Sequence, residues 1–233
     1  MVVESTEQLY KDYIKSNDNK WEFANGILYN LCKDYPKHDD DHVIVAKLWL
    51  IGRSYAAAIE RRPNSTIISD KFYYDIVART INPPDNDKFI DNDKTIESIG
   101  AKLDKSISNI NMCRGSIEDN LETILGTHKL LMDTFQKITG LNKRSLASKY
   151  LHFHCPDYFF LYDSRACSSI NKYVIKPYKK YPVGENYDPE YKNYYCRMLE
   201  LQEFLKNKNL KDVTPRNLDS FLLKKANEES DNC

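Results

Sequence analysis

Asp163 and Arg165 place a carboxylate and a guanidinium side by side, directly after the aromatic and apolar run Tyr158–Tyr162. An ionised carboxylate can act as a catalytic group, because it stabilises positive charge that develops during a reaction. The other interpretation of Asp163 is an N-cap on a helix that begins near Ser164, because aspartate accepts hydrogen bonds from free backbone amides there. The sequence leaves both roles open.

A second feature is the turn Thr139–Asn142, which precedes a helix expected over residues 143–154. Gly140 and Asn142 are the residue types that most readily take a left-handed backbone conformation. We therefore expect a compact turn whose amides point outward at a helix N-terminus, where they can bind a phosphate. The alternative is an ordinary connection between helices, followed by a solvated basic first turn.

Together the two features resemble the helix-hairpin-helix DNA glycosylase superfamily, which includes the 8-oxoguanine and mismatch-specific adenine glycosylases. In that family a hairpin of the type apolar-Pro-Gly-apolar-Gly starts a helix, and a catalytic aspartate at a helix start follows about twenty residues later. Here Ile138–Asn142 matches the hairpin, and Asp163 lies 21 positions after Asn142. The resemblance covers about 35 residues.

The resemblance implies excision of a damaged base, such as the oxidised purine 8-oxoguanine, with Asp163 as the catalytic carboxylate. It also implies a set of DNA-contacting residues: Gly140, Leu141, Asn142, Arg144, Lys149 and Arg165. Two residues depart from the family pattern. Asn142 replaces the second hairpin glycine, and Arg144 stands where members with AP-lyase activity carry a lysine that forms a Schiff base. Since arginine does not lose its proton, we expect Lys143 to take that role if any residue does, and Lys149 less so.

Other polar residues have two interpretations each. His152 and His154 would point to different faces of a helix, so we expect structural roles rather than metal binding, with His152 facing the base pocket. Arg53 shares a helix face with Trp49 and Glu60, which indicates either a stacked, paired arginine or a residue of the base pocket. The tyrosines and lysines of residues 172–195 either stack on bases or pack against the scaffold.

The elements that must position these residues are helical. Apolar periodicity predicts helices over residues 42–61, 67–81, 95–112, 117–138, 143–154, 165–176, 189–207 and 215–226, after one or two helices within 5–35. We expect an all-α fold of about ten helices, with any strands short. The chain reads as a single compact region, with two helical subdomains (about 40–130 and 131–226) and a cleft between them as one possibility.

Composition limits the classes of function. Of the 233 residues, 34 are basic and 34 acidic, so the formal net charge is zero. This balance weighs against a protein that coats nucleic acid nonspecifically, but it allows one local basic face that binds DNA. We expect a cytoplasmic protein with no cofactor, no metal and no membrane span, and with free cysteines. The alternative function is a noncatalytic helical protein that keeps the glycosylase fold to bind nucleic acid or another protein.

Overall fold

The computed structural model describes residues 2–16, 21–61, 71–84, 90–91, 94–95, 97–112, 117–175, 181 and 183–230. This part of the chain folds into ten α-helices: α1 (Thr6–Ser16), α2 (Glu22–Asp34), α3 (Asp41–Ser54), α4 (Arg79–Ile81), α5 (Ile99–Met112), α6 (Leu121–Thr139), α7 (Arg144–His154), α8 (Ser164–Tyr173), α9 (Pro189–Asn207) and α10 (Pro215–Ser230). A π-helix, η1 (Phe72–Ala78), leads into α4, and a 3₁₀ turn, η3 (Glu118–Asn120), leads into α6. The strands β1 (Ile90–Asp91) and β2 (Lys94–Thr95) form a two-residue antiparallel pair. The predicted all-α fold is confirmed.

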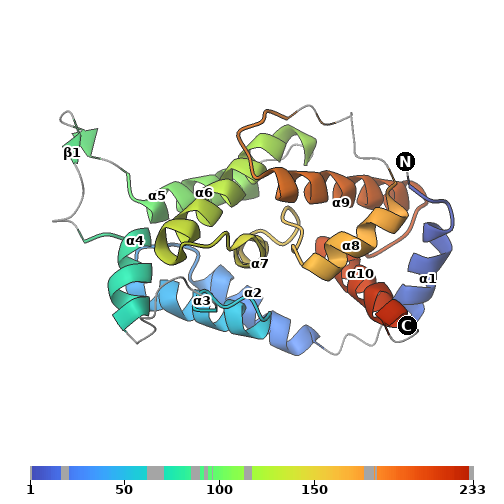
Figure 1. Cartoon of the computed structure of the whole chain (residues 1–233), viewed down its shortest axis with the longest axis horizontal. Helices are drawn as coiled ribbons and strands as arrows, with labels where there is room; N and C mark the ends of the chain where they lie inside the picture. Colours follow the sequence, from blue (N-terminus) through green and yellow to red (C-terminus); the bar gives the residue numbers. More distant parts are fainter. Residues whose placement is uncertain are drawn as a thin grey trace.

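Helix α7 lies in the middle of the molecule (Figure 1), in contact with α2 and α3 on one side and with α6 on the other. Every residue from Leu146 to His154 is buried. Helices α1, α8 and α10 gather at the end of the molecule where both chain termini lie (Figure 1). There the amide of Val3 donates to the carbonyl of Tyr173 (2.9 Å), and the Tyr10 hydroxyl donates to the carbonyl of Asp212 (2.9 Å). The two ends of the sequence therefore stabilise one another.

One predicted helix is too long. The helix expected over residues 42–61 ends at Ser54, because the backbone turns sharply after this residue and Ala57 returns to Gly52. The Ala57 amide donates to the Gly52 carbonyl (2.7 Å), and a Cβ at position 52 would lie 3.0 Å from the Cα of Ala58. Only glycine permits so close an approach without displacing the backbone. The turn also holds Ala56 at a φ of 51°, a strained left-handed conformation for a residue with a Cβ.

The other boundaries agree better with the sequence. Helix α9 covers the predicted residues 189–207, and Asp40 caps α3 by accepting the amides of His42 (2.8 Å) and Val43 (3.1 Å). Of the helix expected over 67–81, residues 67–70 lie outside the described residues, and the rest is η1 followed by α4.

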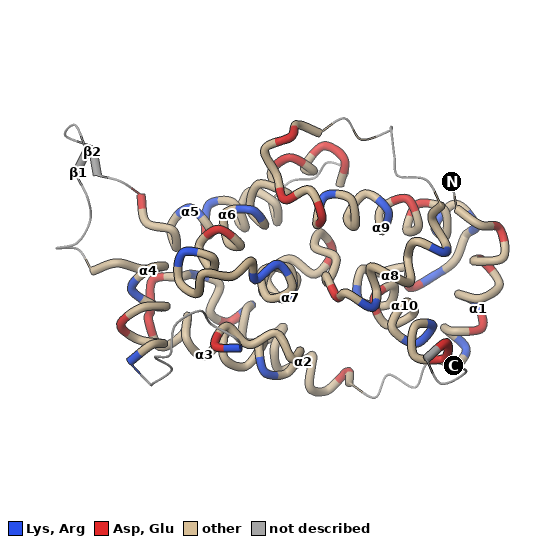
Figure 2. Tube along the Cα trace, viewed as in Figure 1, with Lys and Arg blue, Asp and Glu red and all other residues tan. Residues whose placement is uncertain are grey.

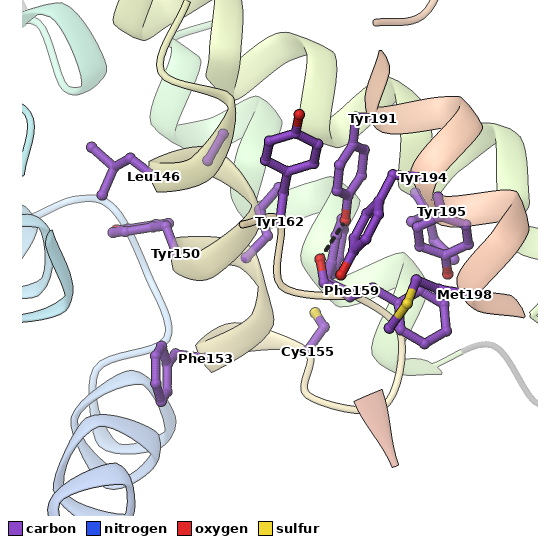
Figure 3. Packing of buried hydrophobic residues seen from close by; sticks show 14 of the residues in the cluster. Leu146, Tyr150, Phe153, Cys155, Phe159, Tyr162, Tyr191, Tyr194, Tyr195 and Met198 are labelled. Carbon is purple, nitrogen blue, oxygen red and sulfur yellow. Dashed lines mark hydrogen bonds between the residues drawn. The ribbon is translucent and has the colours of Figure 1, made fainter. Parts of the chain in front are cut away.

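Between α7 and α8 a turn that includes the half-buried Tyr158 leads into a buried segment outside any helix or strand. We call Tyr158–Tyr162 the buried crossing. A backbone buried outside a helix or sheet must find other partners for its polar groups. Here each carbonyl accepts a hydrogen bond from a side chain: Tyr158 from Tyr195 Oη (2.6 Å), Phe159 from His152 Nδ1 (2.8 Å), Phe160 from Tyr191 Oη (3.0 Å), Leu161 from Tyr194 Oη (2.8 Å) and Tyr162 from Ser145 Oγ (3.0 Å). Figure 3 shows the three tyrosines of α9 packed against this segment.

These contacts decide between the two interpretations of the tyrosine-rich region for three of its members. Tyr191, Tyr194 and Tyr195 are buried, and their hydroxyls are used by the buried crossing. They pack against the scaffold and present no ring face to a nucleic acid. Residues 176–180 of the same region lie outside the described residues.

We predict that Tyr194→Phe lowers the free energy of unfolding by about 1–3 kcal/mol, because it leaves the carbonyl of Leu161 buried without its donor. Urea denaturation followed by circular dichroism measures the change. The matched control is Tyr35→Phe, which removes a hydroxyl from a ring that is 54% exposed and should leave the midpoint unchanged. Equal midpoints for Tyr194→Phe and the wild type would contradict the role given to this hydroxyl.

Candidate functional site

Asp163 caps α8, as one of its two interpretations predicts. Its Oδ1 accepts the backbone amide of Arg165 (3.0 Å), and the Arg165 guanidinium lies 3.4 Å from the same oxygen. The second oxygen, Oδ2, points elsewhere: it lies 3.6 Å from Nζ of Lys149. The Asp163 side chain keeps 22% of its exposure. Capping therefore occupies one oxygen and leaves the other facing an amine.

Lys149 reaches this carboxylate from α7, and its side chain is only 5% exposed. Its Nζ also donates to Ser145 Oγ, one turn earlier on the same helix (2.8 Å). Burial lowers the pKa of the Lys149 ammonium below its ordinary value, although the negative charges of Asp163 and Asp219 oppose the shift. Sequence reasoning assigned Lys149 to DNA contact; the structure instead brings it to Asp163.

Tyr55 was missed as a site residue. Nζ of Lys149 lies 5.8 Å from the centre of its ring, and the Arg216 guanidinium lies 5.4 Å from the same ring. The Tyr55 hydroxyl donates to Asn25 Oδ1 (2.7 Å), which fixes the ring in place. Tyr55 is the C-cap that follows Ser54, the last residue of α3, and it precedes the strained Ala56. The sharp turn that ends this helix therefore also sets the position of the Tyr55 ring. No periodic pattern in the sequence marks such a turn.

Helix α10 contributes two more residues that sequence reasoning missed. Arg216 and Asp219 lie three positions apart, with Arg216 Nη1 3.2 Å from Asp219 Oδ2, and Asp219 is 2% exposed. Their spacing could have indicated an ion pair on one helix. The sequence could not show that this ion pair approaches α7, because sixty residues (155–214) lie between the two helices.

The candidate nucleophile Lys143 lies elsewhere. Its Nζ donates to the carbonyl of Arg61 (2.5 Å), and burial lowers its pKa. Among the described residues, the ion partners of Asp163 are Lys149 and Arg165. The structure therefore pairs Lys149, and not Lys143, with the carboxylate.

The turn at Gly140 differs from its prediction in two respects. Gly140 has a φ of 72°, the predicted left-handed conformation, but Asn142 is not among the described residues with positive φ, so that prediction is wrong. The amides of Gly140 and Leu141 do not point outward. Gly140 donates to the carbonyl of Gln136 (2.7 Å) and Leu141 to Thr139 Oγ1 (3.2 Å), because the turn closes α6 before it opens α7.

The structure also argues against the predicted DNA contact of Arg144. Its guanidinium binds both oxygens of Asp188 (2.6 and 2.8 Å) and an oxygen of Glu190 (2.8 Å), and the side chain is 17% exposed. Asp188 also accepts the amide of Tyr191 (2.7 Å) and so caps α9. This bidentate pair fixes the start of α7 to the start of α9.

The two residues assigned to the base pocket have structural roles instead. His152 is fully buried, donates from Nδ1 to the buried crossing, and accepts the Tyr29 hydroxyl at Nε2 (2.7 Å). Burial lowers its pKa to about 3, which keeps it neutral. Arg53 stacks on Trp49 (5.1 Å) and pairs with Glu60 (2.7 Å), as its structural interpretation predicted, although Glu60 arrives through the turn rather than along the helix.

Two depressions are lined by neighbours of Lys149 and Asp163, although neither Lys149 nor Asp163 is itself among the lining residues. One, of 710 Å³, is lined by Ser145, the hydroxyl partner of Lys149, together with Arg61, Asn142 and Lys143. The other, of 690 Å³, is lined by Ser164 and Arg165, which follow Asp163, and by Lys172. Volumes of 300–1,000 Å³ are typical of ligand sites. One depression therefore reaches the hydroxyl partner of Lys149, and the other reaches the residues that follow Asp163.

The remaining observations concern the molecule as a whole. Basic and acidic residues are interspersed along the helices (Figure 2). Within the described ranges, no helix is long and apolar enough to cross a membrane, and no cluster of three or more His, Cys, Asp or Glu side chains is arranged to hold a metal ion. Comparisons with protein-family models, with curated proteins and with solved structures found no match to this chain.

We predict that Asp188→Asn lowers the free energy of unfolding by about 3 kcal/mol near pH 7, because it leaves Arg144 without its bidentate partner. Asp133→Asn, which disrupts an exposed pair with Lys129 on α6, should cost less than about 0.5 kcal/mol. Burial raises the pKa of Asp188, but hydrogen bonds from Arg144 and from the Tyr191 amide lower it overall.

The pH dependence follows from this lowered pKa. The stability that Asp188 contributes is fully present above its unfolded pKa of about 3.9, and it is lost as the pH falls through the lower folded value. The difference between Asp188→Asn and the wild type should therefore shrink below about pH 4. A difference in unfolding free energy that stays constant from pH 7 to pH 2.5 would contradict this assignment.

Proposed function

We propose that this protein is a DNA glycosylase that removes an oxidised purine, such as 8-oxoguanine, with Lys149 as the nucleophile and Asp163 as its carboxylate. The observation that carries the proposal is the short distance between these two groups: Lys149 Nζ lies 3.6 Å from an Asp163 oxygen that helix capping leaves available. Burial activates a lysine for attack because it disfavours the ammonium form, and the carboxylate beside it can orient the amine.

The chemistry needs the free amine. Its lone pair attacks C1′ of the deoxyribose, and the glycosidic bond breaks with its electron pair leaving on the base. The base takes up the proton that the nitrogen releases. The C1′–O4′ bond then opens, O4′ takes a proton from water, and a protonated imine joins Lys149 to the sugar. Burial supports this step, because it lowers the pKa of Lys149 and so increases the fraction of free amine near neutral pH.

Asp163 would stabilise the positive charge that develops on the sugar. As the base leaves, positive charge builds on the sugar, and an ionised carboxylate nearby stabilises it. The α8 N-terminus holds Asp163 in place through the Arg165 amide, so the carboxylate needs little reorganisation during the reaction. The same carboxylate holds the Lys149 ammonium nearby, with Nζ 3.6 Å from Asp163 Oδ2.

DNA would bind through a few local cations. Arg61 and Lys143 line one depression, and Arg165 and Lys172 line the other. These four residues take the place of the Gly140 amides and Arg144. Each of the four also makes a hydrogen bond within the protein, but its side chain lines a depression. A formal net charge of zero fits binding through a small number of phosphate contacts and a modest salt dependence.

The noncatalytic alternative has one observation in its favour. Arg144 stands at the position of the family's Schiff-base lysine, and it is committed to an ion pair between helices. A protein that only binds nucleic acid or a protein partner would keep the Lys149–Asp163 pair as an internal brace. Such a protein would bind a duplex without releasing a base.

The test uses duplexes that carry one 8-oxoguanine or one abasic site, incubated with the full chain and sodium borohydride. We expect base release and a covalent protein–DNA adduct, since borohydride reduces an imine to a stable amine. Asp163→Asn should slow excision by about 100-fold or more, because it removes the charge that stabilises the sugar cation.

The variant pair Lys149→Gln and Lys143→Gln locates the nucleophile. We expect no adduct from the first at any duplex concentration. The second binds the duplex more weakly but still forms the adduct when the duplex is saturating. A Lys149→Gln protein that still forms the adduct would contradict the assignment. Duplex binding with neither base release nor adduct formation by the wild type would favour the noncatalytic alternative.

A further inference from the structure

Asp219 is a buried carboxylate that the proposed chemistry does not use. It lies in the first turns of α10, is 2% exposed, and has its Oδ2 3.2 Å from Arg216 Nη1. Its other oxygen, Oδ1, is buried and has no hydrogen-bond partner among the described residues. Leaving a buried acceptor unpaired destabilises the fold, so an oxygen kept in this state calls for a functional explanation.

The contacts around Tyr55 place this carboxylate in the Lys149 site. Arg216, the ion partner of Asp219, and Lys149 both lie over the Tyr55 ring, at 5.4 and 5.8 Å from its centre. The start of α8 is tied to α10 as well, through Arg165 and Asn227 (3.4 Å). One aromatic ring thus holds the Arg216–Asp219 pair and the Lys149–Asp163 pair in a single polar cluster.

The electrostatic coupling within the cluster is mutual. Burial raises the pKa of Asp219 to about 6, although Arg216 and Lys149 pull it down and Asp163 pushes it up. Burial lowers the pKa of Lys149, and the negative charges of Asp163 and Asp219 oppose this. The two shifts bring the proton affinities of an amine and a carboxylate closer together, which makes a proton transfer between them less costly.

Four charged groups shift the pKa of Asp219: Arg216 on α10, Lys149 on α7, and Asp163 and Arg165 at the start of α8. Asp219 in turn raises the pKa of four tyrosines on the other neighbouring elements: Tyr55 after α3, Tyr29 on α2, Tyr194 on α9 and Tyr13 on α1. Burial raises the pKa of all four tyrosines, so they stay protonated near neutral pH. Of the two carboxylates, Asp163 has one oxygen engaged as a helix cap and Asp219 has one oxygen without a partner.

We propose that Asp219 is the positioning residue that accepts the proton which the Lys149 ammonium must lose before its nitrogen attacks a sugar carbon. The transfer leaves a neutral amine on Lys149 and a neutral carboxyl on Asp219, which later gives the proton to solvent. The two carboxylates then have different roles. Asp163 stays ionised and stabilises the sugar cation, whereas Asp219 holds the proton from Lys149. This inference rests on the proposed function of Lys149.

The test is the pH dependence of imine trapping. The wild type, Asp219→Asn and the control Asp133→Asn are each incubated from pH 5 to pH 9 with an abasic duplex and sodium cyanoborohydride, and the rate of adduct formation is measured. In Asp219→Asn we expect the rising limb to move to higher pH and the rate at pH 7 to fall by about tenfold or more, because solvent must take the proton. Asp133→Asn should follow the wild type.

The direction of the shift separates proton acceptance from a simple charge effect. If Asp219 only adds negative charge, its loss lowers the pKa of Lys149, and the rising limb moves to lower pH with a faster rate at pH 7. Either that result or an unmoved limb overturns the inference while leaving the proposed function intact. A wild type that forms no adduct at any pH overturns the proposed function itself, and the inference with it.

A second variant, Arg216→Gln, tests the inference even if Asp219→Asn does not fold. Arg216→Gln keeps the carboxyl group and removes its cationic partner, which raises the pKa of Asp219. If Asp219 accepts the proton, this variant also moves the rising limb to higher pH, because the acceptor must be ionised. A limb that moves to lower pH in Arg216→Gln overturns the inference even where Asp219→Asn does not fold.

Discussion

The structure depends on satisfying the backbone of the buried crossing, Tyr158–Tyr162. A segment outside any helix or sheet carries polar groups that no neighbouring strand pairs, and burying them unpaired would cost several kcal/mol in total. Three tyrosines of α9 and two polar side chains of α7 supply the missing donors. Because all five carbonyls are held, the position of Asp163, the next residue, is held as well.

The same constraint explains the character of α7. Its buried surface carries a polar stripe at helical spacing, formed by Ser145, Ser148, Lys149 and His152. Ser145, Ser148 and His152 bind the buried crossing, and Ser148 accepts the amide of Tyr162 (2.9 Å). Lys149 lies in the same stripe and meets Asp163, the residue that follows the crossing. Three members of the stripe thus support the buried crossing, and the fourth belongs to the candidate catalytic pair.

Part of this could be predicted from the sequence. Helical periodicity predicted the all-α fold and the bounds of α9, and one of the two interpretations of Asp163 predicted its helix cap. Reading α7 for its polar residues as well as its apolar ones would have predicted a buried polar partner for Lys149.

The turn after Gly52 could not be predicted, because it depends on a backbone approach that leaves no periodic signal. The place of Arg216 and Asp219 also required the structure, since only the packing of α10 brings them to α7. Arg144 was misassigned because a basic residue at a helix start suits a phosphate and a partner carboxylate equally well.

The central claim is that the pKa of the Lys149 ammonium lies below the ordinary lysine value, because burial outweighs its carboxylate neighbours. The most direct measurement is an NMR titration of the protein with ¹³C-labelled lysine side chains, with the Lys149 signal assigned by its loss in Lys149→Gln. The expected result is a Lys149 pKa below the ordinary lysine value of about 10.4. A Lys149 pKa at or above the ordinary value would contradict the claim and make the Lys149–Asp163 contact a structural ion pair.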